Sequence, residues 1–348
     1  MILNFIFMIF LFFLISFNIL NQQYFNHEKK KKIILQGKTM GTYWQIKIPH
    51  VDNKFYLKNL IQKTLDKDEE MLSSWKKNSI IYQFNQLKKN KILNINKNLL
   101  KIILISLKIN KKTYGKLDIT IGKLINMWGF GNKKKPYNYP SIKKIQKNIS
   151  LTGIQHLKIT SNSMGNYIQK DINGIEINLS TLGEGFAVDH IASILKKKKI
   201  KDYIVSVGGA IKVYIKKEDQ DKIIAIQKPT DKKKSIHLLI HLRNQSISTA
   251  GTYRNYYYLK EKKISHLIDP TTGMPTKSDL VSVSVISSTA LEADGWDTGL
   301  LLLGFKKAKT LALKEKLAVC LINQKNNSLF TWTSPEFKKF ILRTKNVY

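Results

Sequence analysis

The chain has 348 residues, of which 43% are hydrophobic and 24% are charged, and this composition excludes a disordered or collagen-like protein. The formal net charge of +35 invites a nucleic-acid role. However, only three of the 59 basic residues are arginine, the better residue for bidentate contacts with phosphates and bases, and the lysines are scattered among Asn and Ile. We therefore predict no nucleic-acid partner.

Residues 2–20 are almost wholly apolar, and a helix of that length would span about 28 Å, close to the hydrocarbon core of a bilayer. The first alanine is Ala187, so no A-x-A cleavage site is available for a signal peptidase. The single cysteine, Cys320, lies far from this segment, so processing as a lipoprotein is excluded as well. We expect an uncleaved membrane anchor over residues 1–20 and a polar tether over residues 21–36. Lys29–Lys32 would, by the positive-inside rule alone, keep the rest of the chain cytoplasmic.

Beyond the tether, strand and helix patterns follow one another without a strict βαβ rhythm. Runs of β-forming residues predict strands at 41–48, 175–179, 203–207, 222–226, 236–242 and 280–286. Helical spacing of apolar residues predicts helices at 55–75, 99–113, 184–197 and 290–303. This order indicates an α+β fold, with a mixed or antiparallel sheet and packed helices. No repeat or linker divides the chain, so we expect one catalytic unit over residues 37–340 and a tail over 341–348.

Residues 178–185 join the expected strand at 175–179 to a helix and contain Gly183 and Gly185. Unpaired backbone N–H groups at the start of a helix attract phosphate, and glycine lets a ligand approach the backbone closely. The alternative is an ordinary strand–helix turn with a Ser or Thr cap. This segment by itself leaves the choice open.

Residues 292–298 carry oxygen donors at helical spacing. Asp294 and Thr298 are four residues apart and share one helix face, and Asp297 is three residues from Asp294. Hard oxygen ligands of this kind suit Mg²⁺. The alternative is that the acids face solvent, but the apolar residues after them indicate burial, whose cost a cation would offset.

Two further segments carry candidate functional groups. His266 precedes a turn rich in proline and glycine at residues 265–275, where it is a candidate proton acceptor or a structural histidine. Asp118 precedes an aromatic and glycine cluster that includes Trp128 and Phe130. This cluster is a candidate site for a planar heteroaromatic ring, with Asp118 accepting a hydrogen bond from a ring N–H, or else part of the core.

Taken in order, these segments resemble the FAD:protein FMN transferase family, ApbE. The resemblance covers nearly all of residues 37–340, from Gly37-Lys38-Thr39-Met40-Gly41-Thr42 to Trp332-Thr333-Ser334-Pro335. Between these ends it rests on residues 118–120 with 128–131, 179–189, 207–209, 247–254, 266–275 and 293–298. Two positions depart from the family pattern: Asn178 stands where many members have Asp, and Ala250 replaces a common serine.

The resemblance implies a role for individual residues of this chain. Contacts with FAD are implied for Met40, Trp75, Ser79, Asp118, Thr181, Glu184 and Ile268. The implied Mg²⁺ ligands are Asp294, Thr298 and the Thr181 backbone carbonyl, with Asp297 as an addition. His266 is the implied group that deprotonates or orients the incoming hydroxyl.

The resemblance also implies the reaction. A Thr or Ser hydroxyl of an acceptor protein attacks the FMN phosphorus of FAD, FMN becomes attached through a phosphoester bond, and AMP leaves. The acceptors of the family are subunits of membrane ion-translocating redox complexes, which implies an inner-membrane enzyme with its catalytic domain on the periplasmic side. The alternative is an FAD-binding carrier or an FAD pyrophosphatase that transfers nothing to protein.

Overall fold

The computed structural model describes residues 32–342, except residues 231–234 and residue 327. The expected anchor over residues 1–20, most of the expected tether and residues 343–348 of the tail lie outside the described residues. In the part of the chain that is described, no helix is both long enough and apolar enough to cross a membrane.

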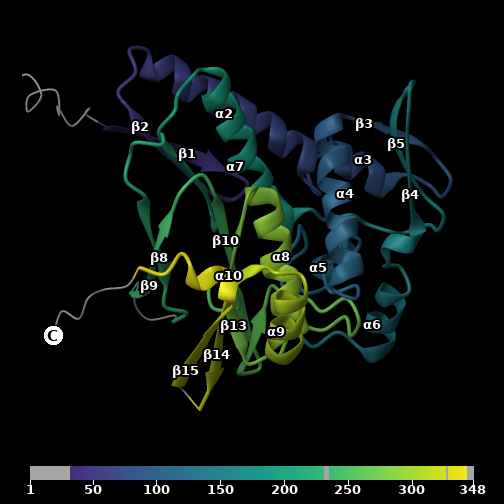
Figure 1. Ribbon diagram of the computed structural model, residues 1–348. Helices are drawn as coiled ribbons and strands as arrows, with labels where there is room; N and C mark the ends of the chain where they lie inside the picture. The colour runs from purple at the N-terminus through teal and green to yellow at the C-terminus, as the bar shows by residue number, and fades with distance from the viewer. Residues whose placement is uncertain (1–31, 231–234, 327, 343–348) are drawn as a thin grey trace, which may run out of the picture.

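The largest sheet of the described residues has eight strands and runs from the upper left to the bottom of the molecule in Figure 1. Its strands follow the order β1-β2-β6-β7-β10-β13-β14-β15, and all of its neighbouring strands are antiparallel. The strands are β1 (Lys32–Thr39), β2 (Thr42–Pro49), β6 (Tyr203–Val207), β7 (Ala210–Tyr214), β10 (Ser246–Gly251), β13 (Leu280–Ser287), β14 (Ala318–Lys325) and β15 (Ser328–Thr333).

Both faces of this sheet are covered, as the side chains of β14 show. Val319 and Leu321 pack with helices α8 (Ala290–Leu303) and α9 (Phe305–Lys314) on one face. Cys320 and Ile322, which point the other way, pack with the hairpin of β8 (Lys222–Gln227) and β9 (Ile236–Leu242) and with α10 (Pro335–Lys338). Successive side chains of a strand alternate between its two faces, so a strand covered on both sides reads as a continuous apolar run.

Helices α2 (Lys54–Leu72) and α7 (Ser180–Lys197) pack against β1, β2 and β6 through a shared apolar cluster. Helix α7 also contacts α8, and Figure 1 shows these two helices in the middle of the molecule. Thr289 caps the start of α8 by accepting a hydrogen bond from the Glu292 N–H at 3.3 Å. Both helices are therefore fixed between the large sheet and the rest of the chain.

A second group of elements lies beside α7 and α8 (Figure 1) and packs in two apolar clusters, one of which also includes residues of α7 and α8. It contains the three-stranded sheet β3-β5-β4 and helices α3 to α6. Their bounds are β3 (Leu93–Ile95), β4 (Leu157–Asn162), β5 (Gly165–Lys170), α3 (Ile80–Gln86), α4 (Lys97–Lys112), α5 (Gly122–Met127) and α6 (Ile142–Ile149). The hairpin β11 (Tyr256–Leu259) and β12 (Lys262–Ser265) and the short 3-10 helix η1 (Ile154–His156) complete the fold.

The expected α+β class is confirmed, and so are the strands expected at 41–48, 203–207, 222–226, 236–242 and 280–286, within two residues at their ends. The helices expected at 99–113 and 290–303 are also present, as α4 and α8. The single thiol, Cys320, is buried in β14, where burial raises its pKa to about 12.

The strand expected at residues 175–179 is wrong. This segment is extended, but many of its backbone N–H and C=O groups form hydrogen bonds with side chains and loops instead of with a neighbouring strand. The Asn85 side chain bonds both the N–H and the carbonyl of Ile177, and the buried Lys170 ammonium donates to the Ile175 carbonyl at 3.0 Å. Buried backbone groups must be paired, and here side chains pair them.

Three expected boundaries also differ. Helix α7 begins at Ser180 and not at residue 184, because Gly183 and Gly185 lie inside the helix, with Gly185 against α8. Helix α2 ends at Leu72, because the Ser73 hydroxyl turns the chain by accepting from the Trp75 and Lys76 N–H groups. Strand β1 begins at Lys32, within the stretch expected to be tether, because Leu35 belongs to the core.

The close contact of α7 with α8 gives a first prediction. An added Cβ at Gly185 would lie 2.4 Å from the Ala290 carbonyl oxygen, whereas one at Gly183 would meet only side-chain atoms at ordinary contact distance, Met40 at 3.5 Å and Leu72 at 3.9 Å. We expect Gly185→Ala to lower the free energy of unfolding by about 1–3 kcal/mol. Gly183→Ala should leave it unchanged or raise it by up to about 1 kcal/mol, because alanine favours helix. Urea denaturation of both variants measures the difference, and equal effects would contradict this packing.

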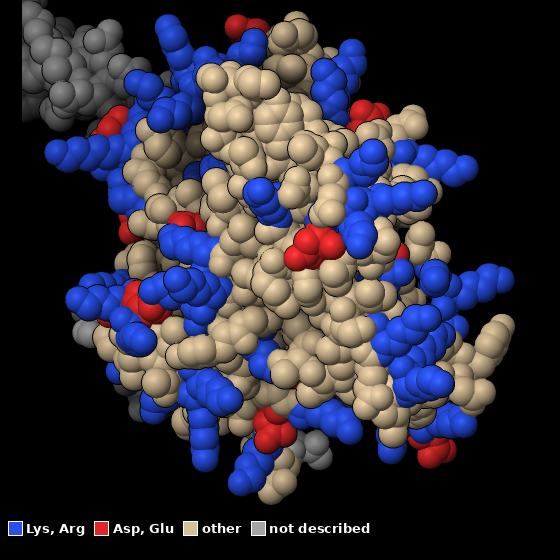
Figure 2. Space-filling model, turned by 90° about the vertical axis from the view of Figure 1, so that its right-hand side faces the viewer, with Lys and Arg blue, Asp and Glu red and all other residues tan. Residues whose placement is uncertain are grey.

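Lys and Arg side chains are spread over much of the face seen in Figure 2, and Asp and Glu side chains lie among them. Some lysines of the described chain form ion pairs, such as Lys108 with Glu292 and Lys112 with Glu315. Exposed ion pairs of this kind contribute little to stability.

Candidate active site

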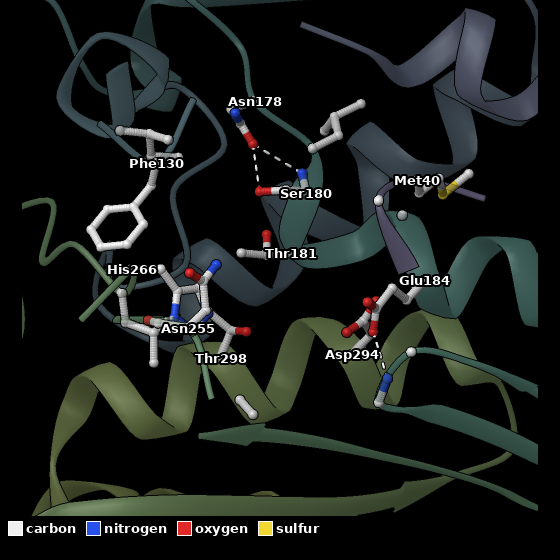
Figure 3. A pocket seen from close by; sticks show the side chains of 18 of the residues that line it. Met40, Phe130, Asn178, Ser180, Thr181, Glu184, Asn255, His266, Asp294 and Thr298 are labelled. Atoms are coloured by element: carbon white, nitrogen blue, oxygen red, sulfur yellow. Dashed lines mark hydrogen bonds between the residues drawn. The ribbon is translucent and has the colours of Figure 1, made fainter. Parts of the chain in front are cut away.

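A cavity of about 690 Å³ opens where the ends of several elements meet. Its wall combines the β1–β2 turn, the end of α2, the start of α7, the β6–β7 turn, β10, the loop around residues 266–268 and one face of α8. Figure 3 shows the side chains of Thr181, His266, Asp294 and Thr298 around this single space. Its volume is in the usual range for a small-molecule site.

Helix α8 contributes Asp294, Asp297 and Thr298 to the cavity, as expected from their spacing. Asp294 accepts from the Gly185 N–H at 2.7 Å and from the Ser248 hydroxyl at 3.3 Å, and Asp297 accepts from the Thr298 hydroxyl at 3.1 Å. Burial raises the pKa of both carboxyl groups well above their usual range, and the neighbouring carboxylates add to the effect at Asp294. Two buried acids therefore lie together, and no compensating positive charge is found beside them among the described residues.

This donor set fits a divalent cation. Among the ion pairs of the described residues, none involves Asp294 or Asp297. No group of three or more His, Cys, Asp and Glu side chains forms a metal cluster in the described part of the chain, so hydroxyl, carbonyl or substrate oxygens must complete any site here. Mg²⁺ is commonly held in this way, by one or two carboxylates together with substrate phosphate and water.

The start of α7 lies across the cavity from α8. Thr181 lines the cavity, and in a regular helix its carbonyl would accept from the Gly185 N–H, which here donates to Asp294. That arrangement favours a Thr181 carbonyl that is available to a cation. Asn178 accepts from the N–H and the hydroxyl of Ser180, so its amide fixes the entry to the helix.

Glu184 also lines the cavity, one turn into α7. Its carboxylate accepts from the Gly209 N–H at 2.7 Å, and burial raises its pKa. The chain at Gly208 has a φ of 51°, and a Cβ there would lie 2.0 Å from the Glu184 carboxylate. Glycine is therefore required at residue 208 for this turn to close on Glu184.

His266 lies beside Phe130 on the cavity wall, with ring centroids 6.2 Å apart. Its Nδ1 is 3.0 Å from the Asn255 carbonyl oxygen. Because a carbonyl only accepts hydrogen bonds, Nδ1 carries the proton, and the neutral ring has its lone pair on Nε2. Burial lowers the pKa of His266, so this base is neutral at pH 7.

The remaining expected FAD contacts line the same cavity, except one. Met40 lies in the β1–β2 turn, Trp75 follows α2 with 47% of its surface exposed, and Asp118 and Ile268 line the wall. Asp118 accepts from the N–H and hydroxyl of Thr120, and burial raises its pKa. These four residues contribute both apolar surface and a hydrogen-bond acceptor.

Ser79 is the exception, because it is fully buried and is not among the residues that line the cavity. Its hydroxyl donates to the Ser73 carbonyl and accepts from the Tyr82 N–H at the start of α3. Ser79 therefore acts on the cavity only through the loop of residues 73–79, which it holds in place.

Sequence reasoning missed other groups at the site. Lys116 lines the cavity and is held at 2.7 Å by Asp269, a contact between segments far apart in the chain. Ser248 supports Asp294 from β10. The Asn255 carbonyl orients His266, and no sequence pattern predicts a contact made by a backbone group of any residue type.

Comparisons with known proteins agree on one group of relatives. A model described as the ApbE family matches residues 40–321. The FAD:protein FMN transferase of Buchnera aphidicola subsp. Schizaphis graminum is 67% identical over 344 residues, which are 99% of this chain and 100% of that protein. The FAD:protein FMN transferase of Escherichia coli K12 is 44% identical, with 90% of each chain covered. The solved structure of flavin transferase ApbE from Vibrio cholerae matches with a TM-score of 0.81 and 31% identity, over 89% of this chain and 99% of that one.

Proposed function

The chain belongs to the ApbE family and is an FAD:protein FMN transferase, and on this premise we propose that it attaches FMN through a phosphoester bond to a Thr or Ser hydroxyl of an acceptor protein and releases AMP. The observation that carries the proposal is the meeting of Asp294, Thr298, Thr181 and His266 around one cavity. These groups come from three separate parts of the chain, and each matches a need of phosphoryl-group transfer.

The chain's own groups have distinct tasks in this reaction. The acceptor hydroxyl gives its proton to the lone pair on Nε2 of His266, and its oxygen bonds to the FMN phosphorus as the bond to the AMP oxygen breaks. The N-terminus of α7 faces the diphosphate with its backbone N–H groups. Asp294, Asp297, Thr298 and the Thr181 carbonyl would hold Mg²⁺, which when bound supplies positive charge to the diphosphate.

Labelling of an acceptor domain tests this function. We expect the full chain, incubated with FAD, Mg²⁺ and the acceptor, to produce an acceptor band with flavin fluorescence and one AMP for each FMN attached. FAD binding without a labelled band would support a carrier instead. Release of both FMN and AMP into solution, with water as the acceptor, would support an FAD pyrophosphatase.

We also propose that the enzyme is anchored in the inner membrane by residues 2–20, with its catalytic domain on the periplasmic side and subunits of membrane ion-translocating redox complexes as acceptors. The apolar length of this segment supports the anchor. A reporter fused after residue 31, immediately before β1, tests the side of the membrane without cutting the sheet. Activity of a periplasm-specific reporter is expected, and activity of a cytoplasm-specific one would reverse the topology.

A further inference from the structure

Three elements run between the cavity and the opposite end of the molecule. Strand β1 and helix α2 both end at the cavity, near Met40 and at residues 69–75, while α7 begins there at Thr181. Eight strand residues and 18 or 19 helical residues each span about 27 Å. The far ends of all three therefore lie roughly that distance from the cavity.

The far ends meet in one place. The Lys198 ammonium, at the end of α7, lies 5.1 Å from the ring centroid of Tyr56 in the first turn of α2. Lys32, the first residue of β1, pairs with Pro49 and forms an ion pair with Asp202 at 3.2 Å. The described chain thus begins beside the start of α2 and the end of α7 (Figure 1).

This end of the molecule carries exposed aromatic rings among lysines. We name as the end face Lys54, Phe55, Tyr56 and Lys196–Lys199. Phe55 is 71% exposed and Tyr56 is 54% exposed, and the Lys54 ammonium lies 5.2 Å from the Phe55 ring centroid. Asp52 is an exposed acid beside these residues, and five lysines outnumber it. Exposed rings with flanking lysines are the composition of surfaces that rest at the lipid headgroups of anionic bilayers.

We propose that the end face rests on the anionic lipid surface of the membrane and holds the cavity about 27 Å above it. This inference rests on the proposed anchoring by residues 2–20. Residues 21–31 separate that segment from Lys32 and can span at most about 40 Å, so the start of β1 lies within that distance of the bilayer. Helix α7, α2 and β1 then act as a spacer, so the acceptor hydroxyl must be presented at that height.

The chain offers a matched pair of positions for a test. Tyr43 is 68% exposed and has the Lys38 ammonium 5.7 Å from its ring centroid, as Phe55 has Lys54, but it lies at the cavity end of β2 and does not line the cavity. The single native thiol, Cys320, is fully buried, and burial raises its pKa to about 12. Phe55→Cys and Tyr43→Cys therefore each accept a polarity-sensitive fluorophore at one defined place.

The full chain is reconstituted in vesicles of phosphatidylcholine and phosphatidylglycerol. We expect nitroxide-labelled lipid to quench the fluorophore at residue 55 at least about twofold and the one at residue 43 hardly at all, with weaker quenching at residue 55 in phosphatidylcholine alone. Equal quenching at the two positions, or none at residue 55, overturns the proposal.

Assays of FMN transfer on the same vesicles separate the two claims. If FMN transfer continues while the fluorophore at residue 55 is not quenched, the proposed orientation is overturned and the proposed function is not. Quenching at residue 55 without any transfer supports the orientation and overturns the function. A chain that does not float with the vesicles overturns both the anchor and the orientation.

Discussion

Asp294→Asn should reduce FMN transfer at least about 100-fold. The substitution keeps the shape of the side chain and leaves an oxygen for the Gly185 N–H, but it removes the negative charge that would hold the cation. Loss of a single group that stabilises charge in a transition state commonly costs about 100- to 1,000-fold in rate. The rate of appearance of the fluorescent acceptor band measures the effect.

Asp294→Asn should not lower the stability of the metal-free protein. Burial and the charges of Asp297 and Glu184 raise the pKa of Asp294, so its ionised form is disfavoured in the fold. Replacing it with a neutral amide removes this repulsion, and replacement of buried charge by neutral groups of similar volume is often neutral or stabilising. We expect an equal or higher Tm without Mg²⁺ and a loss of the increase in Tm that Mg²⁺ and FAD give the wild type.

Glu292→Gln is the matched control for Asp294→Asn. Glu292 is an acid of the same helix, but it pairs with Lys108 at 3.2 Å and does not line the cavity. Its amide variant should keep transfer within about twofold of the wild type, because an exposed ion pair contributes little. Transfer by Asp294→Asn above a tenth of the wild-type rate would contradict the cation site.

His266→Ala should reduce transfer about 100-fold or more while FAD binding stays within a few-fold of the wild type. The physical reason is that a positioned base contributes about 100- to 10,000-fold, whereas the ring of His266 is one small part of a wall of about 690 Å³. Single-turnover labelling measures the chemical step, and quenching of flavin fluorescence measures binding. Equal losses in binding and rate would make His266 a binding residue instead.

The pH dependence follows from the lowered pKa of His266. Its folded pKa lies below the ordinary value of 6.5, so the neutral base persists at pH 6.5 and transfer falls only as the pH drops through the lowered pKa. The free energy of unfolding changes in the same direction. The contribution of His266 to it is full above pH 6.5 and is lost as the pH falls, because the unfolded chain binds the proton more tightly than the folded chain. His266→Ala should lack this acid limb.

His156→Gln is the control for the histidine substitution. His156 pairs with Asp171 at 2.8 Å outside the cavity. Its variant should retain both the wild-type rate and the acid limb of the pH profile. Loss of that limb in His156→Gln would remove the assignment of the limb to His266.

Much of the fold is encoded locally. The helical spacing of apolar residues predicted α8 at residues 290–303, and a run of β-forming residues predicted β13 at 280–286. The same spacing placed Asp294 and Thr298 on one helix face. Met40, Asp118 and Glu184, for which the resemblance implies contacts with FAD, line one cavity, whereas Ser79 does not.

What the sequence by itself determined is thus the order and type of most elements and the chemical groups each one carries. Only the tertiary structure decided that Gly185 lets α7 approach α8 until its N–H reaches Asp294, and that the Asn255 carbonyl sets the proton on His266. It also decided that residues 175–179 bond to the side chains of Asn85 and Lys170 and do not form a strand. Contacts of this kind join residues far apart in the chain, so they depend on how whole elements pack, which local periodicity does not encode.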